Sequence, residues 1–307
     1  MDSGMRPSYL YRITLRQIEI FLAVCRSRHF SRAAEELALT QPAVSAQIRQ
    51  LEKLVGEPLF HYVGKQVQIT GAGEVMMRAA RDLQQRLVTV EMELAELRGA
   101  IQGTLNIAVE SGAQYFMPAL IARFRAEYSA ISVAVEVANR DATLKRLYDN
   151  RQELVIAGSP PQDRAVQFTP FRDNELVAIA RPDHPWREQA QVSLLQLSQQ
   201  ELLIREPGSG TRLILEELAR EQAVKLEHTQ QYGSLEAIKA AVRSGAGLAI
   251  VPLDCAREDI ARGALIALPL EHGPLRRSWC ALHLRRRQLT PVSQRFLQFV
   301  LGGQQSG

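Results

Sequence analysis

A stretch near the amino terminus, LALTQPAVSAQIRQLE (residues 37–52), constrains the fold of this chain more than any other feature. Its apolar positions recur at the spacing of one α-helix face: Val44, Ile48 and Leu51. Pro42 suits the first turn of that helix, because the N–H that proline lacks would have no partner there. The opposite face, which carries Ala46 and Arg49, is small, polar and cationic. Such a face is typical of a solvated surface helix or of a helix presented to a partner.

Two further helices are expected before this one. An apolar stripe predicts the first: Leu15, Ile18, Phe21, Leu22 and Cys25. Ser31 stands where an N-cap belongs, and the small Ala33 and Ala34 suit a close crossing of two helices. Only the dipeptide LT separates the second helix from the third at Gln41. The three segments therefore predict a tight helix-turn-helix whose third helix faces outward and fits the major groove of DNA.

The next segment, GEPLFHYVGKQVQIT, predicts a β-hairpin wing with its tip at Gly64 and Lys65. Residues 1–65 carry nine Lys or Arg against six Asp or Glu, so most of the chain's formal net charge of +4 lies there. That excess favours a phosphate backbone as partner but is too small to establish one alone. The N-terminal domain is predicted to be a winged helix-turn-helix of all-α type over residues 14–72.

The continuous segment from LRQIEIF to ITGAGE resembles, along its whole length, the DNA-binding domain of the LysR-type transcriptional regulators. The resemblance implies that Gln41, Pro42 and Ser45 approach base edges, and a glutamine amide can pair bidentately with adenine. It also implies residues near phosphates or the minor groove: Ser31, Arg32, Arg49 and, at the wing tip, Lys65. Many relatives carry arginine where this chain has Ala46 and Tyr62, and both departures bear on its base preference.

A second pattern predicts one long linker helix over residues 73–101. Apolar residues recur every seven positions in two series: Met76, Leu83, Val90 and Leu97, then Ala80, Leu87, Leu94 and Ile101. The stripe could pack on the chain's own core, but its polar flanks, RDLQQR and EMELAE, favour a dimerising coiled coil. A dimer would place two recognition helices on two half-sites of DNA. We therefore expect a homo-oligomer, either a dimer or a tetramer.

Composition places the chain among ordinary globular proteins. With 307 residues, 46% hydrophobic and 23% charged, it is long enough for two or three domains. It shows no signal peptide and no apolar stretch of membrane-spanning length, so a cytoplasmic location is expected. Its three distant cysteines lack a Cys-x-x-Cys pair, which argues against a disulfide framework or a zinc site. Cys25 is expected to pack as a small hydrophobe.

From Thr104 onward, short β-branched runs alternate with helical stretches, which predicts an α/β domain with a largely parallel sheet. The predicted strands are TLNIAVE, ISVAVEVA, ELVIAG and ELVAIAR. About 200 residues exceed one comfortable α/β unit, so two lobes with a ligand cleft are expected. This effector-binding domain, 103–303, resembles a type 2 periplasmic binding protein. The resemblance implies lobe one at about 103–175 and 273–301, and lobe two at about 176–272.

The segment IREPGSGTRLILEEL (204–218) predicts an anion cradle. A strand runs into a Pro-Gly-Ser-Gly turn and then a helix, whose free N–H groups and dipole point at the turn. The candidate ligands are Arg205, Ser209, Gly210, Thr211 and Arg212. The spacing fits neither a dinucleotide-binding fingerprint nor a nucleophile elbow. Two alternatives stay open: the turn only caps a helix, or the arginines pair with Glu206 and Glu216. Ser234, before a later helix, offers another hydroxyl.

Two strand ends are expected at the same cleft. The residues that follow these strands are Ser111, Gly112 and Gln114, then Asn139 and Arg140. The segments YFMPALIARF, VANRDATLKRL, DNELVAIARPDHPW and REPGSGTR resemble the LysR-type branch that regulates carbon-fixation (RuBisCO) operons and inorganic-carbon uptake. That resemblance implies a small phosphorylated or carboxylated metabolite as effector, such as a sugar bisphosphate, phosphoglycolate or NADPH. The chain departs from the branch at Gln114, where relatives usually place lysine, and at Glu110 and Gly112.

Two other classes of protein compete with a regulator. A cytoplasmic enzyme would need a nucleophile and a base, yet the histidines lie scattered without metal-ligand spacing: His29, His61, His184, His228, His272 and His283. A solute-binding protein would share the α/β fold but needs export. The sequence therefore predicts a LysR-type regulator that binds promoter DNA and a small anionic effector. No enzymatic activity, catalytic residue, metal, cofactor or membrane partner is expected.

Overall fold

The computed structural model describes residues 9–63, 66–271 and 275–302. The chain forms two compact units, Met1–Val90 and Glu91–Gly307, and the long helix α4 (Gly71–Leu97) contributes to both. Lys65, the predicted contact at the wing tip, lies outside the described residues. Among the described helices, none has both the length and the apolar character needed to cross a membrane.

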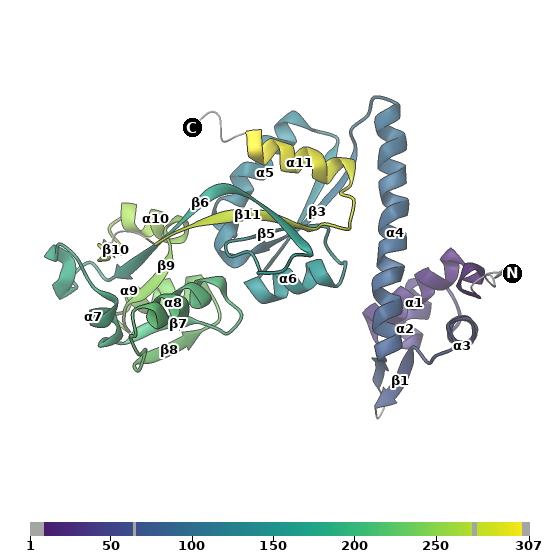
Figure 1. The fold of residues 1–307 in the computed structure, drawn as a ribbon, viewed down its shortest axis with the longest axis horizontal. Helices are drawn as coiled ribbons and strands as arrows, with labels where there is room; N and C mark the ends of the chain where they lie inside the picture. Colours follow the sequence, from purple (N-terminus) through teal and green to yellow (C-terminus); the bar gives the residue numbers. More distant parts are fainter. Residues whose placement is uncertain (1–8, 64–65, 272–274, 303–307) are drawn as a thin grey trace, which may run out of the picture. The chain divides into compact units, whose positions relative to one another are not determined.

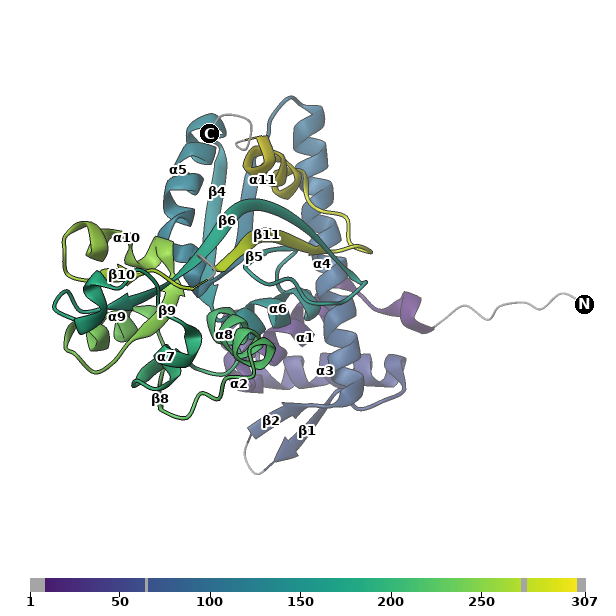
Figure 2. The ribbon, with the colours of Figure 1, turned by 60° about the vertical axis from the view of Figure 1, so that its left-hand side comes forward.

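Three helices and a hairpin build the N-terminal unit (Figure 2). After a 3₁₀ turn η1 (Tyr9–Arg12), the elements are α1 (Leu15–Ser27), α2 (Phe30–Glu36), α3 (Gln41–Val55), β1 (Phe60–Val63) and β2 (Gln66–Ile69). The two strands pair antiparallel, with Phe60 opposite Ile69. Phe21, Val44 and Leu51 are fully buried in the core that the helices share. These elements confirm the predicted winged helix-turn-helix.

Hydrogen bonds fix both ends of α3. The Thr40 side chain accepts from the amide of Ala43, and Pro42 lies in the first turn as predicted. Near the other end, Oε1 of Glu52 accepts from the backbone N–H of Leu59 at 2.8 Å, and also from the next amide at 3.3 Å. This carboxylate therefore ties the start of the wing to the helix that would read DNA.

The prediction that Ser31 caps α2 is wrong. The helix begins before it, at Phe30, and the N-cap position belongs to His29, which makes no side-chain cap hydrogen bond. Arg28 ends α1 in the left-handed conformation, with φ 54°. Because only two residues separate the two helices, Ser31 already lies within the first turn of α2.

Helix α4 presents a row of leucines to solvent. Leu83, Leu87 and Leu94 are 51%, 46% and 49% exposed, whereas Ala80 is buried in the N-terminal core. The three leucines keep the spacing of a coiled-coil seam. An apolar row of this length without a cover is typical of a helix that pairs with another chain.

The predicted linker helix is present, but its bounds differ from 73–101. It starts at Gly71 and ends at Leu97. Gly99 adopts a left-handed conformation (φ 77°), and the Ala100 amide donates to the carbonyl oxygen of Ala95 at 3.1 Å, which closes the helix. Ile101 therefore lies beyond the helix and packs against the core of the C-terminal unit.

The C-terminal unit contains a seven-stranded mixed sheet in the order β10-β6-β11-β5-β3-β4, and β9 also pairs with β6. The strands are β3 (Gly103–Glu110), β4 (Ile131–Ala138), β5 (Leu154–Ala157), β6 (Val166–Ala180), β9 (Ala249–Pro252), β10 (Ile266–Leu268) and β11 (Leu275–Leu284). The prediction of a largely parallel sheet is wrong. Pairs β3–β4 and β3–β5 are parallel, but β6 and β11 run antiparallel to each other and to their other partners. A separate parallel pair joins β7 (Leu202–Arg205) to β8 (Thr229–Tyr232).

We call the part of this unit around β3, β4 and β5 the first half. Its helices are α5 (Met117–Glu127), α6 (Arg140–Tyr148) and α11 (Pro291–Gly302), with the 3₁₀ turn η2 (Ser111–Tyr115) after β3. Alternate residues of β3 face different layers: Ile107 packs with Phe124 and Phe296 under α5 and α11, and Ala108 packs with Leu147 of α6. The sheet is therefore covered on both faces.

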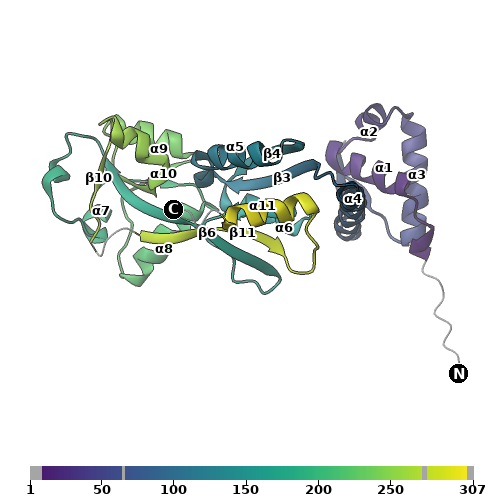
Figure 3. The same cartoon turned by 90° about the horizontal axis from the view of Figure 1, so that it is seen from above.

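The second half contains β7 to β10 with η3 (Pro185–Glu188), α7 (Leu194–Ser198), α8 (Gly210–Glu221), α9 (Leu235–Arg243) and α10 (Leu253–Ala261). Here Ala178 of β6 packs towards Leu215 of α8, and Ile179 packs towards Ile238 of α9. Figures 1 and 3 show β6 and β11 running lengthwise through both halves. The unit is thus two helix-covered halves that share two long strands, which is the two-lobed architecture that the sequence predicts.

Candidate nucleic-acid interface and ligand pocket

The exposed face of α3 carries the residues that were predicted to contact bases. Gln41 and Pro42 are exposed and Ser45 is half-buried, on the side of the helix that the core leaves open. Nε2 of Gln41 donates to Oγ of Ser45 at 2.9 Å. This bond holds two polar groups together, one turn apart, at the amino end of the helix. In helix-turn-helix proteins that end of the recognition helix meets the base edges.

The residues predicted near phosphates are also on the surface. Ser31 and Arg32 are exposed in the first turn of α2, and Arg49 is exposed on α3. Neither arginine has an ion-pair partner among the residues that the structure describes. Exposed guanidinium groups of this kind are suited to phosphate oxygens. Ala46 and Tyr62, the two departures from many relatives, are exposed as well.

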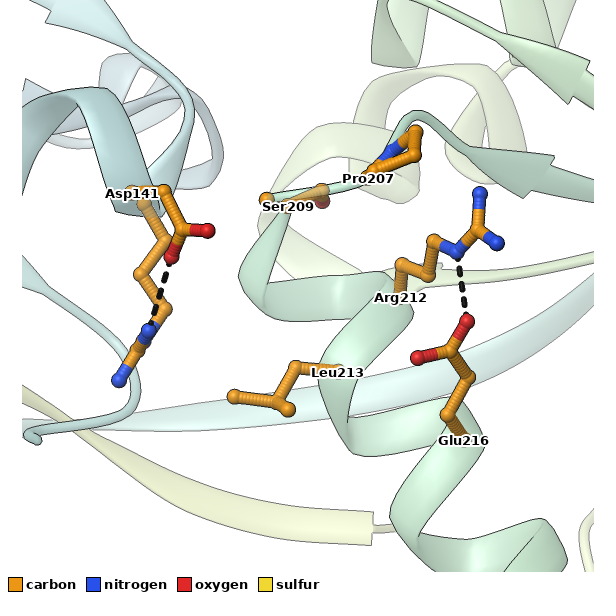
Figure 4. Close-up of a pocket in the computed structure, with 8 residues that line it drawn as sticks. Asp141, Pro207, Ser209, Arg212, Leu213 and Glu216 are labelled. Carbon is orange, nitrogen blue, oxygen red and sulfur yellow. Dashed lines mark hydrogen bonds and ion pairs between the residues drawn. The ribbon is translucent and has the colours of Figure 1, made fainter. Parts of the chain in front are cut away.

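A pocket of about 240 Å³ opens between the two halves of the C-terminal unit (Figure 4). Its lining residues are Arg140 and Asp141 from the start of α6, and Pro207, Gly208, Ser209, Arg212, Leu213 and Glu216 from the turn before α8 and its first turns. At its edge the backbone N–H of Asp141 donates to the carbonyl oxygen of Gly208 at 3.0 Å. The pocket therefore lies where the two halves touch.

Both arginines in the pocket pair with carboxylates of the chain itself. Nε of Arg212 lies 2.6 Å from Oε1 of Glu216, and Nη1 of Arg140 lies 3.1 Å from Oδ1 of Asp141, as Figure 4 shows. The expectation that Arg212 stands ready to neutralise an anion is therefore incomplete, because the ion pair that the sequence left open as an alternative is present. The side chains of Glu216 and Asp141 are 44% and 65% exposed.

Arg205 sits deeper, with only 3% of its side chain exposed. It binds the Glu206 carboxylate through Nε at 2.7 Å and Nη2 at 2.9 Å, and its Nη1 donates to Oγ of Ser111 at 3.1 Å. Asn139 donates to the same carboxylate at 3.3 Å. Burial acts to raise the pKa of Glu206, but the bonds from Arg205 and Asn139 hold that pKa below its usual value. This network brings together three predicted ligand residues from both halves.

The amino end of α8 is open on the side of the pocket. Ser209 occupies the N-cap position, yet its side chain makes no cap hydrogen bond to the helix. Ser209 is 3% exposed and Thr211 is 8% exposed, so both side chains are enclosed. Together with Gly210 they form the first turn of α8, whose amides have no partner within the helix; of these three residues only Ser209 lines the pocket. A buried hydroxyl beside a helix amino end is a favourable environment for an anion.

The other predicted ligand residues lie elsewhere. A side chain at Gly112 would come within 2.9 Å of the Trp279 ring, so close packing explains that glycine. Gln114 is half-buried in η2, and Ser234 caps α9 by accepting from the amide of Ala237 at 3.1 Å. None of these three is among the residues that line the pocket.

Six residues at or beside the pocket were not predicted as ligands: Glu110, Asp141, Pro207, Gly208, Leu213 and Glu216. Glu216 lies four residues after Arg212 on one helix, and this spacing predicts that the two side chains are neighbours. Glu110 was noted only as a departure from relatives, although a carboxylate at the end of an apolar strand is unusual in a buried position.

A winged helix-turn-helix joined to an α/β unit with a polar pocket defines a class of protein, the DNA-binding regulator that carries its own ligand-binding domain. Residues 15–74 match the family description "Bacterial regulatory helix-turn-helix protein, lysR family", and residues 98–305 match "LysR substrate binding domain". The chain belongs to the LysR family of bacterial transcriptional regulators, and not to a family of enzymes.

Named relatives and solved structures agree with this assignment. A RuBisCO operon transcriptional regulator of Allochromatium vinosum is 40% identical over 94% of this chain and 96% of its own length. The regulatory domain of Synechocystis CcmR, solved in complex with 2-PG, is 32% identical with a TM-score of 0.62, over 67% of this chain and 99% of that one. Full-length CbnR in complex with its target DNA shares the fold at 19% identity, with a TM-score of 0.67 over 94% and 99% of the two chains.

Proposed function

We propose that this protein regulates a carbon-fixation operon by binding promoter DNA as a dimer or tetramer, and that a small phosphorylated or carboxylated metabolite alters that binding. The similarity to regulators of RuBisCO operons supports the choice of operon. The protein acts in the cytoplasm, where chromosomal DNA is accessible. The observation that carries the effector assignment is the amino end of α8, where Ser209, an enclosed hydroxyl without a cap hydrogen bond to the helix, lines a pocket that also holds Arg140 and Arg212.

An anion can enter this pocket by exchanging partners with the surface carboxylates. Glu216 and Asp141 are largely exposed, so each can turn into solvent and leave its arginine to the ligand. The arginine side chains are only 14% and 22% exposed, but each keeps another bond to the protein when its carboxylate leaves: Arg140 to the carbonyl oxygen of Ser159, and Arg212 to that of Arg205. The bound anion gains charge-assisted bonds and the favourable end of the α8 dipole. The Synechocystis relative bound to 2-PG supports a phosphorylated or carboxylated ligand.

The pocket position also provides a route from ligand to conformation. We propose lobes at about 103–175 with 273–301, and at about 176–272, joined by the strands β6 and β11. A ligand that contacts Arg140 of one lobe and Ser209 of the other favours one angle between the lobes. An effector shifts a conformational equilibrium by its differential affinity for the two states. The DNA-bound oligomer then responds to the lobe angle.

We expect Gln41→Ala to weaken operator binding by about 1–3 kcal/mol, or roughly fivefold to 150-fold, because a side chain that reads a base is lost. Binding to random DNA should barely change, since phosphate contacts remain. Gel retardation of a DNA site selected by the full chain from a random pool measures both affinities. Gln50→Ala, exposed later in the same helix, is the matched control and should bind as the unmodified chain does. Equal losses on operator and random DNA would remove Gln41 from base recognition.

A further inference from the structure

Glu110 ends strand β3 with a carboxylate that is almost completely enclosed, since only 4% of the residue is exposed. Its Oε2 accepts from the backbone N–H of Gly158 at 2.8 Å. A buried charge is costly unless other groups of the protein stabilise it. Nothing in the DNA-binding role or in the contacts of the pocket described above requires a carboxylate here.

The other oxygen of this carboxylate lies against the first residue of α8. A methyl group on Gly210 would come within 2.2 Å of Oε1, so the carboxylate lies in contact with the start of α8, where the nearby Gly210 amide acts to lower the pKa of Glu110. Glu110 belongs to the first half of the C-terminal unit, and Gly210 belongs to the second. The carboxylate therefore comes from one half and contacts the other. It lies at the amino end of α8, where the preceding residue, Ser209, lines the pocket.

Two cations face this carboxylate, Arg140 at the start of α6 and Arg205 at the end of β7. Burial raises the pKa of Glu110 above its ordinary value, whereas the Gly158 hydrogen bond, the two guanidinium groups and the nearby Gly210 amide oppose that rise. An ionised Glu110 therefore adds a further negative charge beside two arginines that already pair with Asp141 and Glu206. A second anion at the same helix end would lie close to it, and two like charges in an enclosed site repel strongly.

We propose that Glu110 is a proton-accepting competitor for the effector: when an anion binds at the amino end of α8, the Glu110 carboxylate takes up one proton from solvent and donates a hydrogen bond to the anion. This inference rests on the proposed effector site. Glu110 then sets both the affinity for the anion and the pH dependence of anion binding. The reason is that Glu110 must be protonated, and so lose its negative charge, when the negatively charged ligand binds.

The sign of the pH dependence follows from this linkage. Above the pKa of Glu110 in the free protein, each bound anion brings one proton, so anion affinity should fall by up to tenfold per pH unit. Below that pKa the carboxyl is already neutral, and the affinity should be constant. Glu110→Gln imitates the protonated acid in shape and charge, so it should bind the anion more tightly above the pKa and show no such slope.

Inorganic sulfate is the probe, since its charge is constant across the neutral range whereas phosphate titrates there. Calorimetry of the full chain in two buffers with different ionisation enthalpies measures both affinity and proton uptake. In the pH range where the affinity of the unmodified chain falls with pH, that chain should take up close to one proton per sulfate and Glu110→Gln close to none, and one pH unit into that range the variant should bind about tenfold more tightly. Glu153→Gln is the control: Glu153 is also buried, but it bonds to Thr290 and Ser293 at the start of α11. It should bind sulfate as the unmodified chain does.

A second readout comes from Trp279, whose ring packs against Gly158, the residue that bonds to Glu110. In a Trp186→Phe background, sulfate should change the fluorescence of Trp279 with the same pH dependence.

If Glu110→Gln binds sulfate with the affinity and slope of the unmodified chain, and Thr211→Val still abolishes binding, the role of Glu110 is refuted while the effector site stands. If sulfate binds to neither chain, or binds regardless of Thr211→Val, the proposed effector site itself fails.

Discussion

Replacing Leu87 and Leu94 together with lysine is expected to convert the dimer into a monomer and to reduce operator affinity by at least tenfold. Both leucines are about half exposed on α4 and lie seven residues apart on one face. In a coiled coil the lysines would face the same positions of a second copy. Like charges in an apolar seam cost several kcal/mol in all, because a single unpaired buried charge already costs about 3–5 kcal/mol. A monomer would contact one half-site of DNA at a time.

Multi-angle light scattering measures the mass of the variant, and gel retardation measures its affinity for the operator. Leu87→Met with Leu94→Met keeps an apolar surface of similar volume and should remain dimeric. A lysine variant that still scatters as a dimer would show that these leucines do not form the interface between copies.

Arg205→Met is expected to destabilise the C-terminal unit by about 3–5 kcal/mol, because it leaves the half-buried Glu206 carboxylate without its buried cation. Arg205 is 3% exposed and binds Glu206 through two nitrogens, and it also faces Glu110. The pKa of Glu206 is lowered in the folded chain, so its share of stability is present above the unfolded pKa and is lost as pH falls through the folded pKa. In the variant, the free energy of unfolding should therefore depend less on pH in the acid range.

Urea denaturation of the full chain at several pH values measures this change. Arg212→Met is the matched control, since Arg212 is 22% exposed and its partner Glu216 is 44% exposed. Arg212 also donates to Gln231 and to the carbonyl oxygen of Arg205, so its loss should cost about 1–2 kcal/mol, still well below the loss at Arg205. If both variants unfold at the same urea concentration, the buried network around Arg205 does not stabilise the fold.

Local patterns were sufficient to predict the N-terminal unit. The spacing of Val44, Ile48 and Leu51 with Pro42 defines α3 because helix periodicity and capping depend on neighbouring residues alone. The end of α4 was missed for a related reason. The apolar repeat continues to Ile101, but Gly99 adopts a left-handed conformation that stops the helix, and backbone conformation outweighs the repeat.

Long-range pairing could not be predicted to the same degree. The alternation of strands and helices indicates an α/β domain, but it does not say that β6 and β11 are antiparallel neighbours through both halves. For the same reason the sequence showed Arg205, Ser111 and Asn139 as candidates and could not show that they share the Glu206 network. Glu110 lies 100 residues before Gly210, and only the fold brings its carboxylate to the start of α8.

The central claim is that an anion bound at the amino end of α8 changes how this regulator occupies promoter DNA. The direct test is DNase footprinting of the full chain on its selected operator, with and without 2-phosphoglycolate, for the unmodified protein and for Thr211→Val. We expect the ligand to alter the extent or strength of protection by the unmodified protein. Thr211→Val should give the ligand-free footprint at every ligand concentration, with operator affinity within a few-fold of the unmodified chain. A footprint that responds equally in both proteins would contradict the claim.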